Sequence, residues 1–200
     1  MPSNYPPSPL TLAGQYVTLE PLQLKHEDAL IAAASDGNLW NLWFTSIPSP
    51  LTTNQYIETA LVEQTQGKSL PFVVVRNSDQ KIVGTTRYMN IEAMVRRLEI
   101  GSTWYAQNAQ RTPVNTECKF LLLQYAFESL ACIAVEFRTN WFNEKSRNAI
   151  LRLGAKQDGV LRNHRTLSDG TYRDTVVFSI LNSEWPGVKR NLLHRLSRGG

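Results

Sequence analysis

Residues 113 to 130 constrain the fold most strongly, because apolar side chains occupy most of the circumference of the helix that they predict. The apolar positions are Val114, Cys118, Phe120, Leu121, Leu122, Leu123, Tyr125 and Phe127. A helix with one apolar stripe packs against one surface, whereas a helix that is apolar nearly all round is buried. We therefore expect this helix to be covered on two sides.

Strand-like segments precede the helix. Asn77-Ser-Asp-Gln is a polar turn of hairpin length between two of them, which predicts an antiparallel pair. Two helical patterns, residues 26 to 35 and 53 to 66, lie before and after a connection that contains Pro48 and Pro50. The predicted strands cover residues 16 to 20, 71 to 76, 81 to 89 and 97 to 104.

The elements after the helix repeat this alternation. Residues 133 to 139 are typical of a strand, and a short helix follows, with Asn143 as its N-cap and Gly154 as a C-terminal residue of positive φ. Residues 159 to 166 and 172 to 181 form a hairpin around Asp169-Gly170. The order predicts an α/β (α+β) fold with a mixed, mostly antiparallel central sheet flanked by helices.

Length and composition favour a single folded domain. The 200 residues are 42% apolar, enough for one substantial core. Residues 1 to 13 are rich in proline and serine and are expected to be a flexible arm, residues 14 to 182 the domain, and residues 183 to 200 a basic C-terminal helix. The sequence has neither an apolar run of membrane-spanning length nor the pattern of a signal peptide, so we expect a cytoplasmic protein.

Cysteine and histidine positions do not predict a metal site. Cys118 and Cys132 are the two cysteines of the sequence, and a zinc site usually needs a second pair of ligands. His26, His164 and His194 are not spaced like such ligands. Cys118 belongs to an apolar helical pattern, which favours a small core residue over a reactive thiol. We expect no metal and no disulfide framework.

The formal net charge of +4 does not identify a partner by itself. Much of the excess comes from the C-terminal residues Lys189, Arg190, Arg195 and Arg198. A basic face on a packed helix explains them better than a nucleic-acid arm does, although an anionic cofactor and RNA would both benefit from the positive field. We therefore do not expect a nucleic-acid partner.

Gln110-Arg-Thr-Pro-Val-Asn-Thr-Glu carries the clearest chemical signal. It lies between a strand and the buried helix, where free N–H groups and the helix dipole attract an anion such as a phosphate. Thr112 is a natural N-cap and Pro113 a natural first helical residue, so an ordinary helix start is an equal alternative.

This segment and the order of elements over about residues 14 to 182 resemble the GCN5-related N-acetyltransferases, in particular the branch of ribosomal-protein N-terminal acetyltransferases. That branch carries Gln-Arg-Thr-Gly-Val-Asn-Thr-Glu at the loop that binds the pyrophosphate of coenzyme A. Pro113 replaces the glycine of this pattern and removes one N–H donor. The residues that match are Gln110, Arg111, Thr112, Val114, Asn115, Thr116 and Glu117.

A second segment, residues 140 to 155, is similar to the family's N-x-x-S/A helix. The resemblance implies that Asn143 contacts the pantetheine arm and that Ser146 protonates the departing coenzyme A thiolate. Each residue has a plainer alternative, since Asn143 can simply cap the helix and Ser146 can satisfy a nearby backbone donor.

The general base and the carbonyl-polarising groups are further hypotheses. Glu99 lies where the family's strand lines the acceptor cleft; the alternative is an exposed carboxylate paired with Arg87 or Arg97. His164 is a second candidate base, near the position of an acidic residue in the ribosomal-protein branch. Backbone amides from Gly101 through Ser102 to Thr103 would polarise the thioester carbonyl, with Gly101 at a bulge.

The resulting functional hypothesis is acetyl transfer from acetyl-coenzyme A to a primary amine, either a protein N-terminus or a small molecule. Tyr172, Arg173 and Asp174 follow the hairpin turn and are candidate specificity residues, although Asp174 paired with an arginine would be an ordinary structural feature. A coenzyme A-binding module without turnover is the alternative function. A homodimer is kept as a hypothesis for the assembly.

Overall fold

The computed structural model describes residues 7–167 and 169–199 as one sheet with helices on both faces. The strand order is β1-β2-β3-β4-β5-β6-β8-β7, and β5 and β6 are its parallel neighbours. This confirms the predicted mixed, mostly antiparallel sheet. The strands are β1 (Leu12–Ala13), β2 (Val17–Pro21), β3 (Ser69–Arg76), β4 (Lys81–Glu92), β5 (Arg97–Tyr105), β6 (Ala134–Asn140), β7 (Lys156–Thr166) and β8 (Tyr172–Leu181).

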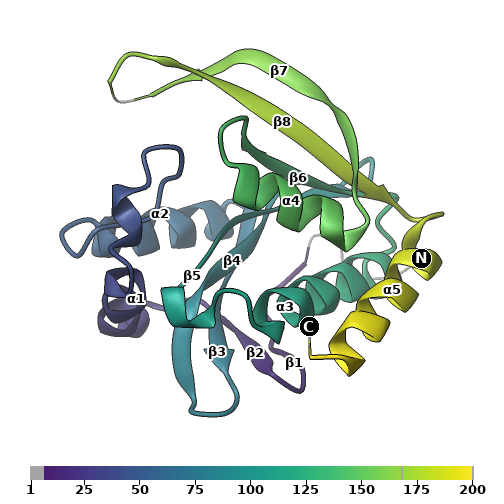
Figure 1. Cartoon of the computed structure of the whole chain (residues 1–200), viewed down its shortest axis with the longest axis horizontal. Helices are drawn as coiled ribbons and strands as arrows, with labels where there is room; N and C mark the ends of the chain where they lie inside the picture. Colours follow the sequence, from purple (N-terminus) through teal and green to yellow (C-terminus); the bar gives the residue numbers. More distant parts are fainter. Residues whose placement is uncertain (1–6, 168, 200) are drawn as a thin grey trace.

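The helices form a layer on each face of the sheet (Figure 1). Strand β3 explains why, because its side chains alternate: Phe72 and Val74 belong to the larger core cluster, and Val73 and Val75 to the smaller one. Helices α1 (Glu27–Ser35) and α2 (Thr53–Thr65) cover the smaller cluster. Helices α3 (Pro113–Gln124), α4 (Glu144–Leu153) and α5 (Trp185–Ser197) cover the larger one.

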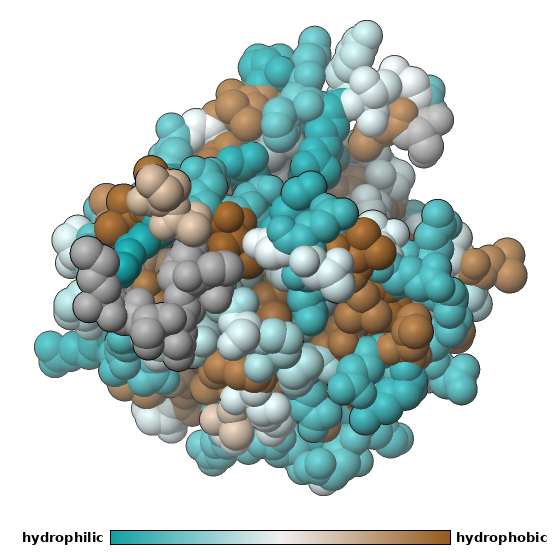
Figure 2. Space-filling model, turned by 180° about the vertical axis from the view of Figure 1, so that it is seen from behind, coloured by the Kyte–Doolittle hydropathy of each residue, from teal (hydrophilic) through white to brown (hydrophobic). Residues whose placement is uncertain are grey.

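The β7–β8 hairpin extends past the end of its neighbouring strand. Pairing of β6 with β8 begins at Asn140 and Thr175, so Tyr172 and Arg173 lie beyond it. Figure 1 shows the hairpin passing over α4 toward the side of the molecule that carries α1 and α2. Seen from behind, its surface at the top of the molecule mixes hydrophilic and hydrophobic groups (Figure 2). The hairpin therefore overhangs one end of the sheet.

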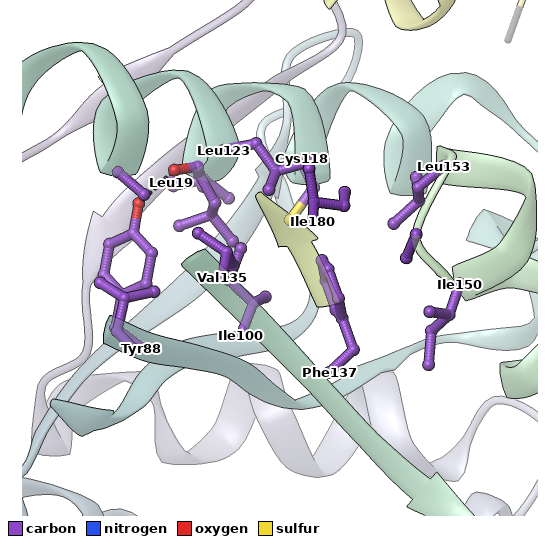
Figure 3. Close-up of a cluster of buried hydrophobic side chains, with 14 of the residues drawn as sticks. Leu19, Tyr88, Ile100, Cys118, Leu123, Val135, Phe137, Ile150, Leu153 and Ile180 are labelled. Carbon is purple, nitrogen blue, oxygen red and sulfur yellow. Dashed lines mark hydrogen bonds between the residues drawn. The ribbon is translucent and has the colours of Figure 1, made fainter. Parts of the chain in front are cut away.

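Helix α3 is covered on two sides, as the sequence predicts. Its Cys118, Leu122 and Leu123 are fully buried, and Figure 3 shows Cys118 and Leu123 facing strand residues such as Val135. On its other side α3 packs against α5, where the Trp185 ring lies 6.3 Å from that of Phe120. The Cys118 thiol is a core group, and burial raises its pKa.

The helix predicted to run through residue 130 changes register before its end. Helix α3 stops at Gln124, and Tyr125–Ser129 forms a π-helical turn, closed by the Leu130 amide donating to the Tyr125 carbonyl. The buried Tyr88 hydroxyl donates to the Leu122 carbonyl at 2.5 Å. Because that carbonyl is occupied from the side, the backbone hydrogen bonds shift to wider spacing at this point.

The start of the fold is held by Glu117 from the second turn of α3. Its carboxylate accepts hydrogen bonds from the amides of Gln15, Tyr16 and Val17 at 2.6 to 2.8 Å. Leu12 and Ala13, within the predicted arm, pair with β2, and residues 1 to 6 of that arm lie outside the described part. Residue 13 as the end of the arm stays a prediction.

The predicted basic helix at the C-terminus is α5, whose inner side is apolar. Trp185, Val188 and Leu192 are buried, and the Trp185 ring nitrogen donates to Glu128 Oε1. Lys189 pairs with the same carboxylate at 2.7 Å. In the described part of the chain, α5 and the other helices are all too short or too polar to cross a bilayer.

Candidate active site

The parallel pair β5–β6 separates soon after it begins. Its register covers Arg97 with Ala134, Leu98 with Val135, and Glu99 with Glu136, and then ends. Both strands continue, β5 to Tyr105 and β6 to Asn140, without pairing to each other. Backbone groups of both strands are thereby left available between them. Two segments that carry predicted site residues follow the diverging strands, the start of α3 after β5 and the start of α4 after β6.

A β-bulge lies in the part of β5 that is not paired with β6. Thr85 and Arg87 of β4 pair with Trp104 and Gly101, so β5 has one extra residue between them. The bulge was predicted at Gly101, but the residue with positive φ is Ser102, at 45°. Gly101 answers a different requirement, because a Cβ there would lie 2.6 Å from Met89 Sδ and 3.0 Å from Glu99 Oε1.

Lys119 holds the bulge from the α3 side and was missed by the sequence analysis. Its Nζ donates to Thr103 Oγ1 at 2.5 Å and to Thr86 Oγ1 at 3.2 Å. The side chain is buried, which lowers its pKa to about 8. A lysine in an otherwise apolar helix is the signal that could have identified Lys119, because a buried ammonium requires polar partners.

Glu99 lies on the opposite face of β5 and is not the exposed carboxylate of the alternative hypothesis. The residue is 6% exposed, and burial raises its pKa. Its Oε2 accepts from Asn90 at 2.7 Å and lies 3.6 Å from Arg138 Nε. Arg87 and Arg97 pair instead with Glu63 and Glu136. The other oxygen, Oε1, makes no hydrogen bond within the described residues and borders Gly101.

The predicted phosphate loop forms the connection from β5 to α3. The Gln110 side chain donates from its Nε2 to the Tyr105 carbonyl at 3.0 Å. Arg111 has a positive φ of 61° and an exposed side chain. Thr112 is the N-cap and Pro113 the first helical residue, as predicted. Within the described part, the amides of Arg111 and Thr112 make no hydrogen bond.

The first turn of α3 offers fewer free amides than the sequence suggested. The Val114 amide donates to Thr112 Oγ1, although at a long 3.4 Å. Asn115 is partly exposed, whereas Thr116 is buried and lies one turn after the N-cap, where amides enter the helical ladder. An anion here would meet Arg111, Thr112 and Asn115 at the positive end of the helix.

Helix α4 begins shortly after the end of β6. Asn143 is its N-cap, and Asn143 Oδ1 accepts from the Ser146 amide at 3.0 Å. The Ser146 hydroxyl makes no hydrogen bond with described residues and is partly exposed. Capping thus uses one oxygen of Asn143 and the amide of Ser146, and leaves the Asn143 Nδ2 group and the Ser146 hydroxyl for a ligand.

Asn140, the last residue of β6, is a second residue that the sequence analysis missed. It is 2% exposed, its Oδ1 accepts from the Phe142 amide, and its buried Nδ2 has no partner among the described residues. Buried amide donors are normally satisfied. Its position at the end of the diverging strand therefore makes it a candidate ligand-binding group.

His164 is held on the hairpin beside Thr175, which pairs with Asn140 at the end of β6. Its Nδ1 lies 3.1 Å from Thr175 Oγ1, and burial together with Arg165, Arg138 and Arg173 lowers its pKa. A lowered pKa keeps the imidazole neutral near pH 7. Asp174 pairs with Arg162 at 2.5 Å, so the ordinary structural alternative holds for this residue.

Two shallow hollows meet at Arg138 on the face that carries Glu99. One, of about 390 Å³, also contacts Glu136 and Asp158, and the other, of about 370 Å³, contacts Asn90 and Lys68. Arg138 bridges the carboxylates of Glu99 and Glu136. Across the described residues, His, Cys, Asp and Glu side chains do not gather in groups that could hold a metal ion.

Comparisons with known proteins identify the architecture. A model described as "Acetyltransferase (GNAT) domain" matches residues 17–156. A crystal structure of a GCN5-related N-acetyltransferase from Brucella melitensis is 31% identical, with a TM-score of 0.83 over 94% of this chain and 86% of that one. Mycobacterium smegmatis RimJ, in complex with CoA-disulfide, has a TM-score of 0.77 at 21% identity over 98% and 97% of the two chains, a likeness of fold alone.

A curated relative from Bacillus subtilis, "Putative ribosomal N-acetyltransferase YdaF", is 32% identical over 111 residues. The match spans 56% of this chain and 60% of the relative. The family model, in contrast, covers more than half of the chain, from β2 to the start of β7. The chain therefore belongs to the GNAT family of acetyltransferases.

Proposed function

We propose that the protein transfers an acetyl group from acetyl-coenzyme A directly to a primary amine. The observation that carries the proposal is the divergence of β5 and β6, with a Glu99 oxygen of β5 and the Ser146 hydroxyl of the helix after β6 both without a hydrogen bond among the described residues. Family membership and the ligand of the Mycobacterium smegmatis relative support acetyl-coenzyme A as the donor.

The residues at the starts of α3 and α4 suit a cofactor with phosphates and an extended arm. Arg111, Thr112 and Asn115 would hold the pyrophosphate at the start of α3, and Asn143 would donate to the pantetheine arm. The chemistry that the cofactor supplies is a thioester carbon open to attack by an amine.

The protein's own groups would manage one proton on each side of the transfer. Glu99, buried and with a raised pKa, would accept the proton of the attacking amine through its free Oε1. Backbone amides of the Gly101–Thr103 bulge would donate to the carbonyl oxygen. The Ser146 hydroxyl would donate a proton to the departing sulfur. His164 is the second candidate for the base.

A coenzyme A-binding module without turnover is the alternative function, and Pro113 is the observation that favours it. Proline at the first helical position removes an amide that would face the pyrophosphate. This alternative and the enzyme both predict binding of the cofactor, so they are separated only by turnover.

The test is calorimetric titration with acetyl-coenzyme A combined with a thiol-release assay on an amine panel. For Ser146→Ala we expect turnover to fall by about 100-fold, because proton donation is lost, and cofactor affinity to fall much less. Ser183→Ala, in the turn before α5, is the matched control. Binding without thiol release from any amine would support the alternative, and equal turnover of Ser146→Ala would remove its role as the acid.

A further inference from the structure

Two arginines of the hairpin lie on the same face of the sheet as Glu99. Glu99 pairs with Glu136, and Glu136 pairs with Ser179 of β8. Side chains along a strand alternate, so Arg173, six residues before Ser179, shares this face. Arg165 of β7 pairs directly with Arg173. The hairpin therefore extends the Glu99 face with two guanidinium groups.

These two guanidinium groups form no salt bridge in the described part of the chain, although the Glu99 carboxylate acts on both electrostatically. Like charges directly opposite each other destabilise an antiparallel pair. The neighbouring acids are already engaged, since Asp174 pairs with Arg162 and Glu136 with Arg138. The Arg173 Nε is shielded from solvent and has no hydrogen-bond partner. This arrangement is one that a bound oxyanion would complete.

The arginine pair lies next to the proposed reaction centre, on the side away from the cofactor phosphates. Glu99 is coupled electrostatically to both arginines, which lie on its face of the sheet. Helix α3, whose first turn is the phosphate site, packs on the opposite face through Cys118 and Leu122. An anion bound by the arginines would therefore belong to the acceptor and not to coenzyme A.

We propose, on the basis of the acetyltransferase function above, that Arg165 and Arg173 form an acceptor subsite for an oxyanion. The acceptor class is then a small primary amine that carries a carboxylate or a phosphate. Both groups match the planar donor fork of a guanidinium. Arg173, partly exposed but with its Nε shielded from solvent, supplies one donor, and the exposed Arg165 supplies the other.

The first experiment measures binding without turnover. The ¹H–¹⁵N signals of the arginine Nε groups are recorded for the full chain with coenzyme A, during titration with inorganic phosphate and with ω-amino acids of two to six carbons. We expect the Arg165 and Arg173 signals to shift, and the matching amides of the amino acids to leave them unchanged. Absence of a shift with every anion would overturn the subsite, whatever the enzyme acetylates.

The second experiment measures selectivity. Each ω-amino acid, its amide and an aminoalkyl phosphate of similar length are compared by kcat/KM, and the phosphate compound distinguishes the two oxyanions. Arg173→Gln should lower the preference for acid over amide by about tenfold or more, because the acids lose their oxyanion contact and the amides have none to lose.

Arg162→Gln, on the same hairpin but paired with Asp174, is the control and should keep the preference. Thermal melts confirm that the variants are folded. Arg173→Lys is a further variant, which keeps the positive charge but lacks the planar set of guanidinium donors. Equal rates for acids and amides in the wild type would reject the subsite and leave the acetyltransferase function standing. Shifted arginine signals without acetylation of any amine would reject the acetyltransferase function and leave the anion subsite standing.

Discussion

At the residue scale, Glu99 shows how one carboxylate is kept reactive. Its burial raises its pKa, while Asn90 and Arg138 hold Oε2 and leave Oε1 free beside Gly101. Desolvation and a fixed orientation together are what a general base requires. The same burial opposes the stability of the fold, because the ionised form is penalised.

Glu99→Gln tests both effects. Turnover should fall by about 100-fold and lose the rise with pH that the Glu99 pKa produces. Because the folded-state pKa is raised, the stability that Glu99 contributes is complete below its unfolded-state pKa and is lost as pH rises through the folded-state pKa. The variant should therefore gain in free energy of unfolding relative to wild type at pH 8, and less at pH 5.

Rate profiles against pH and urea unfolding at the two pH values measure these changes. Glu92→Gln, at the exposed end of β4, is the control and should alter neither. If the Glu99→Gln variant keeps the acidic limb of the rate profile, the role of base would shift to His164.

Local signals in the sequence were sufficient for several of these residues, and tertiary ones were not. Thr112, Asn143 and Gly154 were predicted correctly because a cap or a positive φ depends on a few neighbouring residues. The alternative that paired Glu99 with Arg87 or Arg97 was wrong, because Arg138 comes from a strand that is distant in sequence. Lys119 and Asn140 were missed because their roles depend on what the fold buries.

At the element scale, α3 joins two functions in its first two turns. Pro113 and the residues around it would bind the cofactor phosphates, while Glu117 holds the turn before β2. The order and type of the elements followed from alternation and capping. The π-helical end of α3 did not, because it depends on the hydroxyl of Tyr88, a residue of β4.

Pro113→Gly separates binding from stability within this element. The glycine restores an amide at the first helical position, so we expect coenzyme A to bind several-fold more tightly. The free energy of unfolding should fall by about 0.5 to 1 kcal/mol, because glycine gives the unfolded chain more freedom. Calorimetric titration and urea unfolding measure the two changes.

Pro186→Gly is the matched control, since Pro186 lies in the first turn of α5 and far from the phosphate loop in sequence. It should lose similar stability and keep the same cofactor affinity. Weaker binding by Pro113→Gly would show that the fixed φ of proline helps to shape the loop.

At the scale of the whole molecule, the three-layer fold depends on its last helix. The rings of Trp185 and Phe127 lie 5.4 Å apart, and Val188 and Leu192 complete the apolar side of α5. Arg190 of the same helix is exposed and Lys189 and Arg195 are partly buried, so removal of the helix deletes core and charge together.

Deletion of residues 183 to 200 should therefore lower the free energy of unfolding by about 5 kcal/mol or more, because large buried side chains are lost. Circular dichroism melts of this truncation, compared with deletion of residues 198 to 200 alone, measure the loss. A cooperative transition at the wild-type temperature would show that α5 is an accessory to the fold.

The short pairing of β5 with β6 has a mechanical meaning. Three residue pairs join these strands, whereas seven join β6 to β8. The sheet thus consists of two parts, β1 to β5 and β6 to β8, which are joined by this short pairing and have α3 packed against them. Under mechanical force, the two parts would separate first between β5 and β6. The opening proposed for the substrates therefore coincides with the weakest junction in the sheet.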